Sequence, residues 1–255
     1  RVLVIGCGAG DLIASALSAP RVALIDQVEI DPAVIETARR HIPEQNTHRG
    51  KSIWENPRVR LRYEDGRQFL RDSPERYDGI VVDLPNLSRE AVGPFYSAEF
   101  MRLARERLKP GGIFLAHTFQ GPWTGPGEGG RRRSFAASLI AARTARSVFG
   151  SNAYLMHPGL WLERRKPDDI LRVGMVMASK GPLDASETKV RERMRALSPP
   201  LRWLTPERYR RWLDGAGLPP DVEALPISTD DRPTILYAGL WARSEVVRRL
   251  LSASR

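Results

Sequence analysis

The stretch VLVIGCGAGDL, residues 2–12, decides the fold class. The apolar run Val2 to Ile5 predicts a short buried strand, and glycines at positions 6, 8 and 10 then predict a tight turn into a helix over residues 11–18. Such glycines allow close backbone approach and present N–H groups at a helix start, where phosphates and nucleosides bind. The stretch therefore predicts an α/β fold with a ligand at the end of its first strand.

The spacing of the glycines separates two classes of nucleotide-binding loop. The dinucleotide fingerprint needs glycines at the first, third and sixth positions, and here the sixth position is Asp11. The pattern that remains is G-x-G-x-G, formed by Gly6, Gly8 and Gly10, which is similar to the loop of S-adenosylmethionine-dependent enzymes. On the loop alone, an ordinary strand-to-helix turn is the alternative interpretation.

Strand and helix patterns alternate along the first half of the chain, which predicts a doubly wound, mainly parallel sheet. Beyond residue 180 the pattern changes to short charged helices around prolines. We therefore expect a nucleoside-binding α/β domain over residues 1–180 and a helical C-terminal extension, packed on the same domain, over residues 181–255. Strands are predicted over residues 2–5, 21–30, 58–63, 77–83, 113–119, 153–156 and 170–178, helices over 11–18, 32–41, 67–71, 97–108, 133–149, 187–197, 206–215 and 238–252, and irregular chain over 42–57 and 120–130.

Composition limits the classes of function. The 255 residues include one cysteine, Cys7, so no disulfide can form within the chain, and a cytoplasmic location fits. No apolar run approaches the roughly 18 residues that suggest a membrane span. The net charge is +10, but the arginines are spread along the chain apart from the run at 131–133, and no zinc-ligand spacing occurs. We expect neither a specific nucleic-acid partner nor a metal.

Three acidic residues follow the ends of predicted strands, where open α/β sheets place their ligands. Glu29 lies at the distance from the loop where a carboxylate accepts hydrogen bonds from ribose hydroxyls; its alternative role, capping the next helix, suits Asp31 better. Asp65 can accept from an adenine amino group or cap a helix, and Gly66 permits close backbone approach. Asp83 ends an apolar strand, which favours function over a loop aspartate that bonds nearby backbone N–H groups.

The stretches VLVIGCGAG, VEIDPAVIETARR, PRVRLRYEDGRQFL, YDGIVVDLP, VGPFYSAEF and LKPGGIF, taken in order, resemble the spermidine synthase family, the polyamine aminopropyltransferases. The similarity covers residues 1–119 well, and LPISTDDRPTILY near the end resembles the closing motif of longer bacterial members, including members joined to membrane-embedded segments. The resemblance implies the fold of S-adenosylmethionine-dependent transferases.

The family transfers an aminopropyl group from decarboxylated S-adenosylmethionine to a diamine, commonly putrescine. By resemblance, the nucleoside would contact the glycine loop, Glu29 at its ribose, Asp65 and Gly66 at its adenine, and Pro94 along one side. Asp83 would be the catalytic acidic residue. An alkylamine has a pKa of roughly 10, as lysine does, so a carboxylate must receive its proton and aim its lone pair before it can attack.

Further residues bear on the small-molecule amine acceptor. Besides Asp83, we expect Asn86 and Tyr96 near it, although core packing is an equal alternative for Tyr96. His117 is a weaker candidate for facing the pocket. Asp230 could supply acidic charge, with a local Asp–Arg contact as the alternative.

Three departures from the family pattern put diamine recognition in doubt. Ala9 stands where the family usually has an aspartate that holds the aminopropyl amine, with Asp11 two residues on; Asn86 replaces a second aspartate; and the segment over residues 83–94 is longer. Ala9 and Asn86 support one alternative, a methyltransferase that uses intact S-adenosylmethionine. A non-catalytic nucleoside-binding module is a further alternative.

The chain starts directly at its first strand, whereas family members carry a small β-rich segment before it. We expect that N-terminal segment to be missing here. A membrane segment attached outside this chain would place it at the cytoplasmic face, which its positive charge suits. A homodimer is also compatible with the resemblance.

Overall fold

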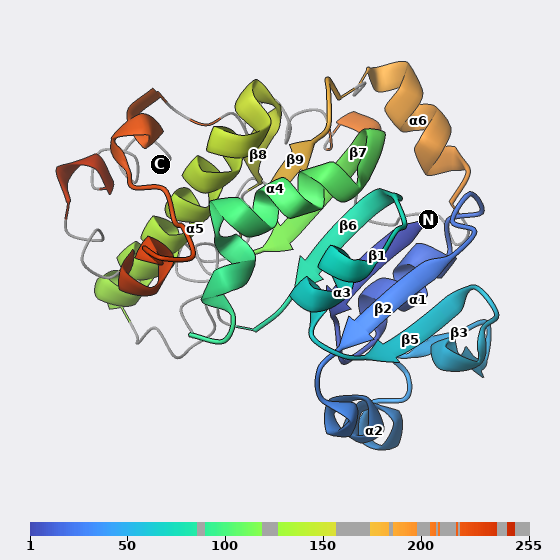
Figure 1. Ribbon diagram of the computed structural model, residues 1–255. Coiled ribbons are helices and arrows are strands. Elements are labelled where there is room, and N and C mark those ends of the chain that lie inside the picture. Colours follow the sequence, from blue (N-terminus) through green and yellow to red (C-terminus); the bar gives the residue numbers. More distant parts are fainter. Residues whose placement is uncertain are drawn as a thin grey trace.

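The computed structural model contains a seven-stranded sheet with helices on both faces (Figure 1). Neighbouring strands follow the order β5-β2-β1-β6-β7-β9-β8, in which the first five are parallel and β9 and β8 are antiparallel additions. The structure describes residues 1–85, 90–118, 127–156, 174–183, 186–197, 205–207, 209, 218, 220–238 and 244–247, with only the backbone for 127–135 and 220. The strands of the sheet are β1 (Val2–Gly6), β2 (Ile25–Glu29), β5 (Val59–Tyr63), β6 (Tyr77–Asp83), β7 (Leu108–His117), β8 (Ala153–Met156) and β9 (Met175–Ser179). The predicted doubly wound sheet is confirmed.

Alternate side chains of the central strands point to opposite faces of the sheet and build two separate cores. On β1, Leu3 and Ile5 join the core beneath α3, α4 and α5, while Val4 joins the core beneath α1. All three side chains are buried, which explains the continuous apolar run at the start of the chain. The helices are α1 (Asp11–Leu17), α2 (Pro32–His41), α3 (Gly66–Asp72), α4 (Ala98–Arg107), α5 (Gly127–Phe149) and α6 (Glu187–Arg195).

Three of these helices begin at the side chains that capping chemistry favours. Asp31 accepts a hydrogen bond from the Ala33 N–H at 2.9 Å and begins α2, as predicted. Asp65 accepts from the Gln68 N–H at 2.8 Å at the start of α3, and Ser97 does the same for α4. The caps fix where each helix leaves the carboxyl edge of the sheet, and therefore which residues border that edge.

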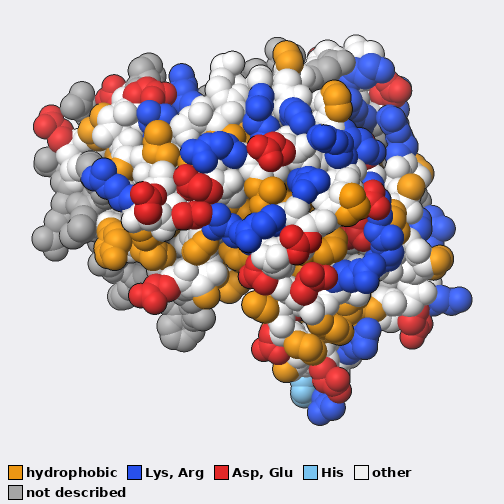
Figure 2. Space-filling model, in the orientation of Figure 1, with side chains coloured by type: hydrophobic (Ala, Val, Ile, Leu, Met, Phe, Trp, Pro, Cys, Tyr) orange, Lys and Arg blue, Asp and Glu red, His pale blue; other side chains and the backbone are white. Residues whose placement is uncertain are grey.

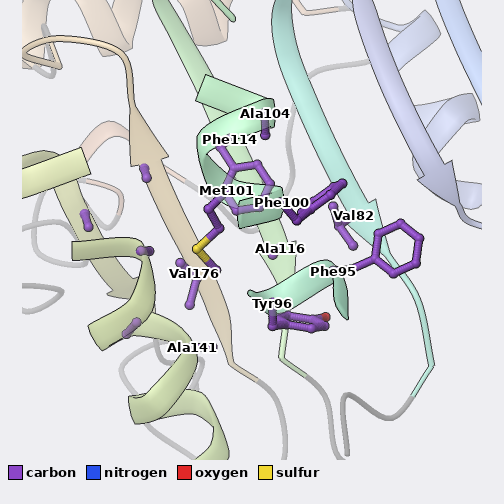
Figure 3. Packing of buried hydrophobic residues seen from close by; sticks show 14 of the residues in the cluster. Val82, Phe95, Tyr96, Phe100, Met101, Ala104, Phe114, Ala116, Ala141 and Val176 are labelled. Atoms are coloured by element: carbon purple, nitrogen blue, oxygen red, sulfur yellow. The ribbon is translucent and has the colours of Figure 1, made fainter. Parts of the chain in front are cut away.

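Aromatic rings fill the larger core between α4, α5 and the sheet (Figure 3). The Phe100 ring centroid lies 5.1 Å from that of Phe95 and 6.4 Å from that of Phe114, both in edge-to-face geometry. Phe114 in turn stacks on Phe149 of α5 at 5.9 Å. Because Phe95 belongs to the 3-10 turn η2 (Gly93–Tyr96), this core also anchors the turn that borders the sheet's carboxyl edge.

A buried carboxylate joins the first strands at their other end. Asp26 of β2 is fully buried, and its two oxygens accept hydrogen bonds from Arg1 at 3.1 Å and Arg60 at 2.7 Å. Arg1 precedes β1 and Arg60 lies in β5, so one carboxylate bridges three neighbouring strands. The buried negative charge of Asp26 is tolerated because both oxygens of its carboxylate are paired.

The C-terminal residues pack on the same core as the sheet. Ser228 receives a hydrogen bond from the Ala98 N–H at 2.8 Å and donates its own N–H to the Thr144 hydroxyl at 3.0 Å. Leu236 lies against Gly93 of η2. These contacts join Ser228 and Leu236 to the α/β domain, while the domain division at residue 180 stays a prediction. The described turns of this region are η7 (Pro220–Ala224) and η8 (Thr234–Tyr237).

The structure corrects several predicted boundaries. Residues 42–57 are not irregular throughout: they contain the hairpin strands β3 (Thr47–His48) and β4 (Lys51–Ser52) and the turn η1 (Ile53–Glu55). Strand β2 begins at Ile25 rather than residue 21, β7 begins at Leu108 rather than 113, and α5 begins at Gly127, inside the stretch expected to be a loop. Residues 170–173 and most of 206–215 and 238–252 lie outside the described residues.

Charge is mixed over the visible surface. Lys and Arg side chains are spread across the face in Figure 2 and alternate with Asp and Glu rather than forming one patch. Within the described residues, no helix combines the length and the apolar character needed to cross a bilayer.

Replacing Phe100 with alanine tests the aromatic core. The ring is fully buried and contacts two others, so Phe100→Ala should lower the free energy of unfolding by about 3–5 kcal/mol in urea denaturation. Tyr237→Ala is the control, because this side chain is 58% exposed and its loss should change the free energy by less than about 1 kcal/mol. Equal effects of the two substitutions would contradict this core assignment.

Candidate active site

The point where the sheet reverses its winding lies between β1 and β6. From β1 the chain builds outward through β2 and β5, then returns to place β6 on the other side of β1. Open α/β sheets bind ligands at the carboxyl ends of strands at this reversal point. In the parallel register Gly6 is opposite Asp83, so the glycine loop and the predicted catalytic aspartate meet there.

The glycine loop, residues 6–10, passes very close to β6. Gly6 has φ +86°, and a Cβ at this position would overlap the Asp83 carbonyl oxygen and lie 2.9 Å from Leu84 Cδ2. The Cys7 N–H donates to the same carbonyl oxygen at 3.0 Å. Gly10, with φ +85°, begins α1 in the left-handed conformation. The first and last glycines are thus required by the backbone itself.

Glu29 lies beside the middle of the loop. A Cβ at Gly8 would overlap the Val34 side chain and lie 3.7 Å from Glu29 Oε2. Glu29 Oε1 accepts a hydrogen bond from the Asp31 N–H at 3.1 Å, while Asp31 caps α2 as expected. The structure therefore brings the predicted ribose ligand and the predicted loop together, and Glu29 also steadies the chain before α2.

Two exposed apolar side chains border Glu29, and sequence analysis did not single them out. Ile30 follows Glu29 and is 68% exposed, and Tyr63, 49% exposed, lies opposite Glu29 on β5. A large apolar side chain left in water at a sheet edge is a candidate contact for a ligand. The signal in the sequence was Ile30, the apolar residue between Glu29 and Asp31, which we interpreted as part of the strand predicted over residues 21–30.

Asp65 and Gly66 continue the same edge. The Asp65 side chain is exposed and caps α3, which confirms the structural role predicted for it and leaves its adenine role a prediction. Gly66 is buried, because a Cβ there would overlap the side chain of Ile5. The close approach that Gly66 permits is therefore to β1.

Asp83 faces His117 from the neighbouring strand. The Asp83 Oδ1 and His117 Nδ1 atoms are 3.4 Å apart, and the two side chains are 28% and 29% exposed. Each ends its strand at the carboxyl edge, so His117, the weaker sequence candidate, does reach the predicted site. An acid and an imidazole in contact, both open to solvent, can pass a proton to each other and to water.

Tyr96 lies behind this pair, as the core-packing alternative predicted. Its side chain is fully buried, and its hydroxyl donates to the His117 carbonyl oxygen (Figure 3 shows the ring of Tyr96, the last residue of η2). Burial raises the pKa of the phenol, and the negative charge of Asp83 adds to the effect. We therefore assign Tyr96 to positioning β7 rather than to direct contact with a substrate. Pro94, two residues earlier, is half-buried, and Asn86 lies outside the described residues.

One group of three potential metal ligands occurs in the described part of the chain. The ligand atoms of Cys7, Asp11 and Asp83 lie within 4.8 Å of one another. Burial, with the charges of Asp83 and Asp11 adding to it, raises the pKa of the Cys7 thiol to about 12. The chemical character of this group is two carboxylates beside a buried thiol.

The remaining acidic candidate is neutralised by a distant arginine. Asp230 forms a two-point ion pair with Arg67 of α3, with one contact at 2.8 Å, and its N–H donates to Glu99 at 3.0 Å. This ion pair lowers the pKa of Asp230. The Asp–Arg contact exists, but it is not the local contact with Arg232 that the sequence suggested.

A surface cavity of about 460 Å³ lies between the glycine loop and α2. Its lining is formed by the loop and by residues along α2, from the N-cap of the helix to its C-cap. The cavity adjoins Glu29 through Gly8 and therefore extends the candidate site away from the sheet. It is lined by Gly8, Ala9, Asp31, Ala33, Val34, Thr37, Ala38, His41 and Ile42.

Comparison with known proteins agrees with this geometry. Residues 1–126 match the family model described as the spermine/spermidine synthase domain. The resemblance to the spermidine synthase family is confirmed over these residues. The match contains the glycine loop, Glu29, Asp65 and the Asp83–His117 pair, so every described part of the candidate site except the Asp230 contact lies within the spermine/spermidine synthase domain.

Curated relatives of the spermine/spermidine synthase domain are polyamine aminopropyltransferases. The chain is 36% identical over 118 residues to one from Korarchaeum cryptofilum, covering 46% of this chain and 35% of that protein. It is 31% identical over 195 residues to one from Nitrosomonas europaea, covering 76% of this chain and 54% of that protein. The chain thus spans about a third to a half of these two relatives.

Solved structures share the fold. A spermidine synthase in complex with the transition-state analogue AdoDATO superposes with a TM-score of 0.62 at 23% identity, covering 88% of this chain and 66% of the other. A spermidine synthase from Thermotoga maritima gives the same TM-score at 22% identity, covering 88% of this chain and 68% of the other. The architecture of the sheet therefore agrees with that of spermidine synthases.

A pair of glycine substitutions separates backbone strain from steric overlap at the loop. Gly6 and Gly50 both have positive φ, but a Cβ at Gly50 meets nothing within 4 Å. Gly50→Ala should therefore cost only the left-handed conformation, about 1–2 kcal/mol of unfolding free energy. Gly6→Ala should cost about 1–3 kcal/mol more, because β1 and β6 must separate. Equal losses in urea denaturation would rule out the overlap.

The alkylation rate of Cys7 measures how well the folded loop shields this thiol from solvent. Its side chain is buried and its pKa is raised to about 12, so few molecules carry the reactive thiolate at pH 8. Iodoacetamide should modify the native protein at least about a hundredfold more slowly than the protein unfolded in urea. The rate in the native protein should rise with pH beyond pH 9, as the thiolate fraction grows. A native rate near that of the unfolded chain would contradict the buried placement of Cys7.

Proposed function

We propose that this chain is a polyamine aminopropyltransferase, which moves an aminopropyl group from decarboxylated S-adenosylmethionine to a small diamine such as putrescine. The observation that carries the proposal is the meeting of Gly6 and Asp83 at the reversal point of the sheet, inside a spermine/spermidine synthase domain. The names of the curated relatives and the AdoDATO-bound spermidine synthase support the same reaction class.

The residues around the loop fit an adenosyl ligand. The Glu29 carboxylate can accept hydrogen bonds from both ribose hydroxyls, and Ile30 and Tyr63 offer apolar surface to a flat base next to it. Asp65, exposed at the start of α3, can accept from an adenine amino group. A side chain at position 8 would overlap Val34 and approach Glu29, so glycine at this position keeps side-chain atoms out of the space between the loop and Glu29. When bound, the adenosyl compound supplies an electrophilic methylene next to a positive sulfonium.

Asp83 and His117 can prepare the amine. A protonated diamine is attracted to the Asp83 carboxylate and gives up one proton to the Asp83–His117 pair, from which it reaches solvent. The freed nitrogen then forms a bond to the methylene as the carbon–sulfur bond breaks and its electrons return to sulfur. The sulfur becomes a neutral thioether, and the new secondary amine leaves with its positive charge. Alignment of the two reacting atoms supplies much of the rate.

A second candidate function rests on Ala9. This residue is half-buried and lines the cavity beside the loop, where the family's usual aspartate would repel the carboxylate of intact S-adenosylmethionine. Ala9 places no negative charge there. A methyltransferase that uses the intact compound is therefore the competing proposal, and the preferred form of the adenosyl ligand separates the two.

Calorimetric titration with the two adenosyl compounds tests the proposal. Decarboxylated S-adenosylmethionine should bind at least about tenfold more tightly than the intact form, because the acidic groups Asp11 and Asp83 beside the loop would repel the carboxylate of the intact form. A preference for the intact form would favour the methyltransferase. If neither compound binds, both enzyme proposals are contradicted, and the nucleoside-binding alternative has no support either.

Substitution of Asp83 separates binding from chemistry. Asp83→Asn should lower the rate of aminopropyl transfer by about a hundredfold or more while changing the affinity for the adenosyl compound only slightly. His117→Gln should lower the rate less, because Asp83 remains. Asp78→Asn is the matched control, since Asp78 lies in the same strand at the opposite edge of the sheet and pairs with Lys109. An Asp83→Asn variant with the wild-type rate would refute the catalytic assignment.

A further inference from the structure

A buried polar side chain holds the glycine loop from below. Gln27 lies in the middle of β2, between the buried residues Asp26 and Val28, and is fully buried. Its Nε2 atom donates hydrogen bonds to two backbone carbonyls of the loop, Gly6 O at 3.3 Å and Cys7 O at 3.1 Å. A polar residue at the centre of a buried parallel strand is costly unless every polar atom is paired.

The other end of the same amide is also occupied. Trp54 of η1 donates its indole N–H to Gln27 Oε1 at 2.7 Å. The Arg39 guanidinium of α2 lies over the Trp54 ring, 4.8 Å from its centroid. The Gln27 amide therefore connects the loop to η1, and the Arg39–Trp54 contact connects η1 to α2.

The loop has a conformation that needs such support. Cys7 has φ +60° although it is not glycine, and Gly6 and Gly10 on either side are also left-handed. A left-handed conformation costs free energy for a residue with a Cβ, and surrounding contacts must hold it. The Gln27 amide binds the carbonyl of Cys7 itself and that of the residue before it. On the far side, Ile53 and Asn46 occupy the space that a Cβ on Gly10 would enter.

We propose that Gln27 and Trp54 are positioning residues that keep the glycine loop in its ligand-binding conformation. Glutamine is suited to the place because one amide both donates to the loop and accepts from the indole, whereas a carboxylate cannot donate. The identity of the ligand rests on the proposed function above. The role of Gln27 and Trp54 in holding the loop does not rest on the proposed function, because it depends only on contacts within the chain.

The alkylation rate of Cys7 tests the hold directly, because Cys7 is the only cysteine in the sequence and lies in the loop. Trp54→Phe keeps an aromatic ring and removes only the donor to Gln27. Its alkylation by iodoacetamide at pH 8 should be roughly tenfold faster than in the wild type, because a buried acceptor loses its partner. Gln27→Met, of similar volume, should accelerate alkylation by at least as much.

A double substitution distinguishes a coupled pair from two independent supports. Trp54→Phe combined with Gln27→Met should alkylate no faster than Gln27→Met alone, because the hydrogen bond is already absent. Arg39→Gln is the matched control: it removes the cation over the indole ring but keeps the N–H donor, so its rate should stay within about twofold of the wild type. Circular dichroism and urea denaturation show whether each variant is folded, and Trp54→Phe remains informative if Gln27→Met is not.

The affinity for S-adenosylmethionine and its decarboxylated form supplies a second measurement. In Trp54→Phe the dissociation constant of whichever compound the wild type prefers should rise by less than about twofold, since a tenfold rise from about one open molecule in a hundred still leaves about nine in ten with the competent loop. An unchanged alkylation rate in Trp54→Phe would overturn the positioning role, whatever the binding data show. A rise of the dissociation constant by tenfold or more would contradict a role limited to holding the loop. If the wild type binds neither compound, the proposed function fails, and the alkylation series still decides whether the pair holds the loop.

Discussion

The contact on which the site depends is the backbone approach of Gly6 to the carbonyl of Asp83. No side chain fits between them, and the Cys7 N–H closes the approach with a hydrogen bond. This approach fixes the ends of β1 and β6 relative to each other, which in turn brings the Asp83 carboxylate beside the loop. Every other candidate group, from Glu29 to His117, is placed by a strand or helix that leaves this same edge.

Much of this arrangement could be predicted because its causes are local in the sequence. The apolar run before Gly6 predicts β1, and the aspartates at positions 31 and 65 predict the starts of α2 and α3 through ordinary capping. The parallel topology then places all strand ends at one edge, so Glu29 and Asp83 are brought there without any knowledge of tertiary contacts. The boundaries that were wrong, such as the start of β7, lie where glycine and proline were interpreted as ending the pattern.

Other features depend on contacts between distant parts of the chain, and no local pattern contains them. Tyr96 could have faced a ligand or the core, and only the packing of η2 on β7 decides for the core. Gln27 is noticeable as a polar residue in an apolar strand, but its partner Trp54 lies in a segment expected to be irregular. The ion pair of Asp230 with Arg67 joins residues 163 positions apart, so the sequence suggested the nearer Arg232 instead.

That ion pair has a consequence for how the protein forms during synthesis. Arg67 leaves the ribosome about 163 residues before Asp230, which at ordinary translation speeds is a delay of roughly ten to thirty seconds. During this interval strands β1, β2 and β5 have been synthesised, while Arg67 and Glu99 lack their later contacts with Asp230. The nascent chain therefore exposes the apolar surface at Gly93 of η2 until Ile235 and Leu236 have been synthesised, and exposed apolar surface favours aggregation.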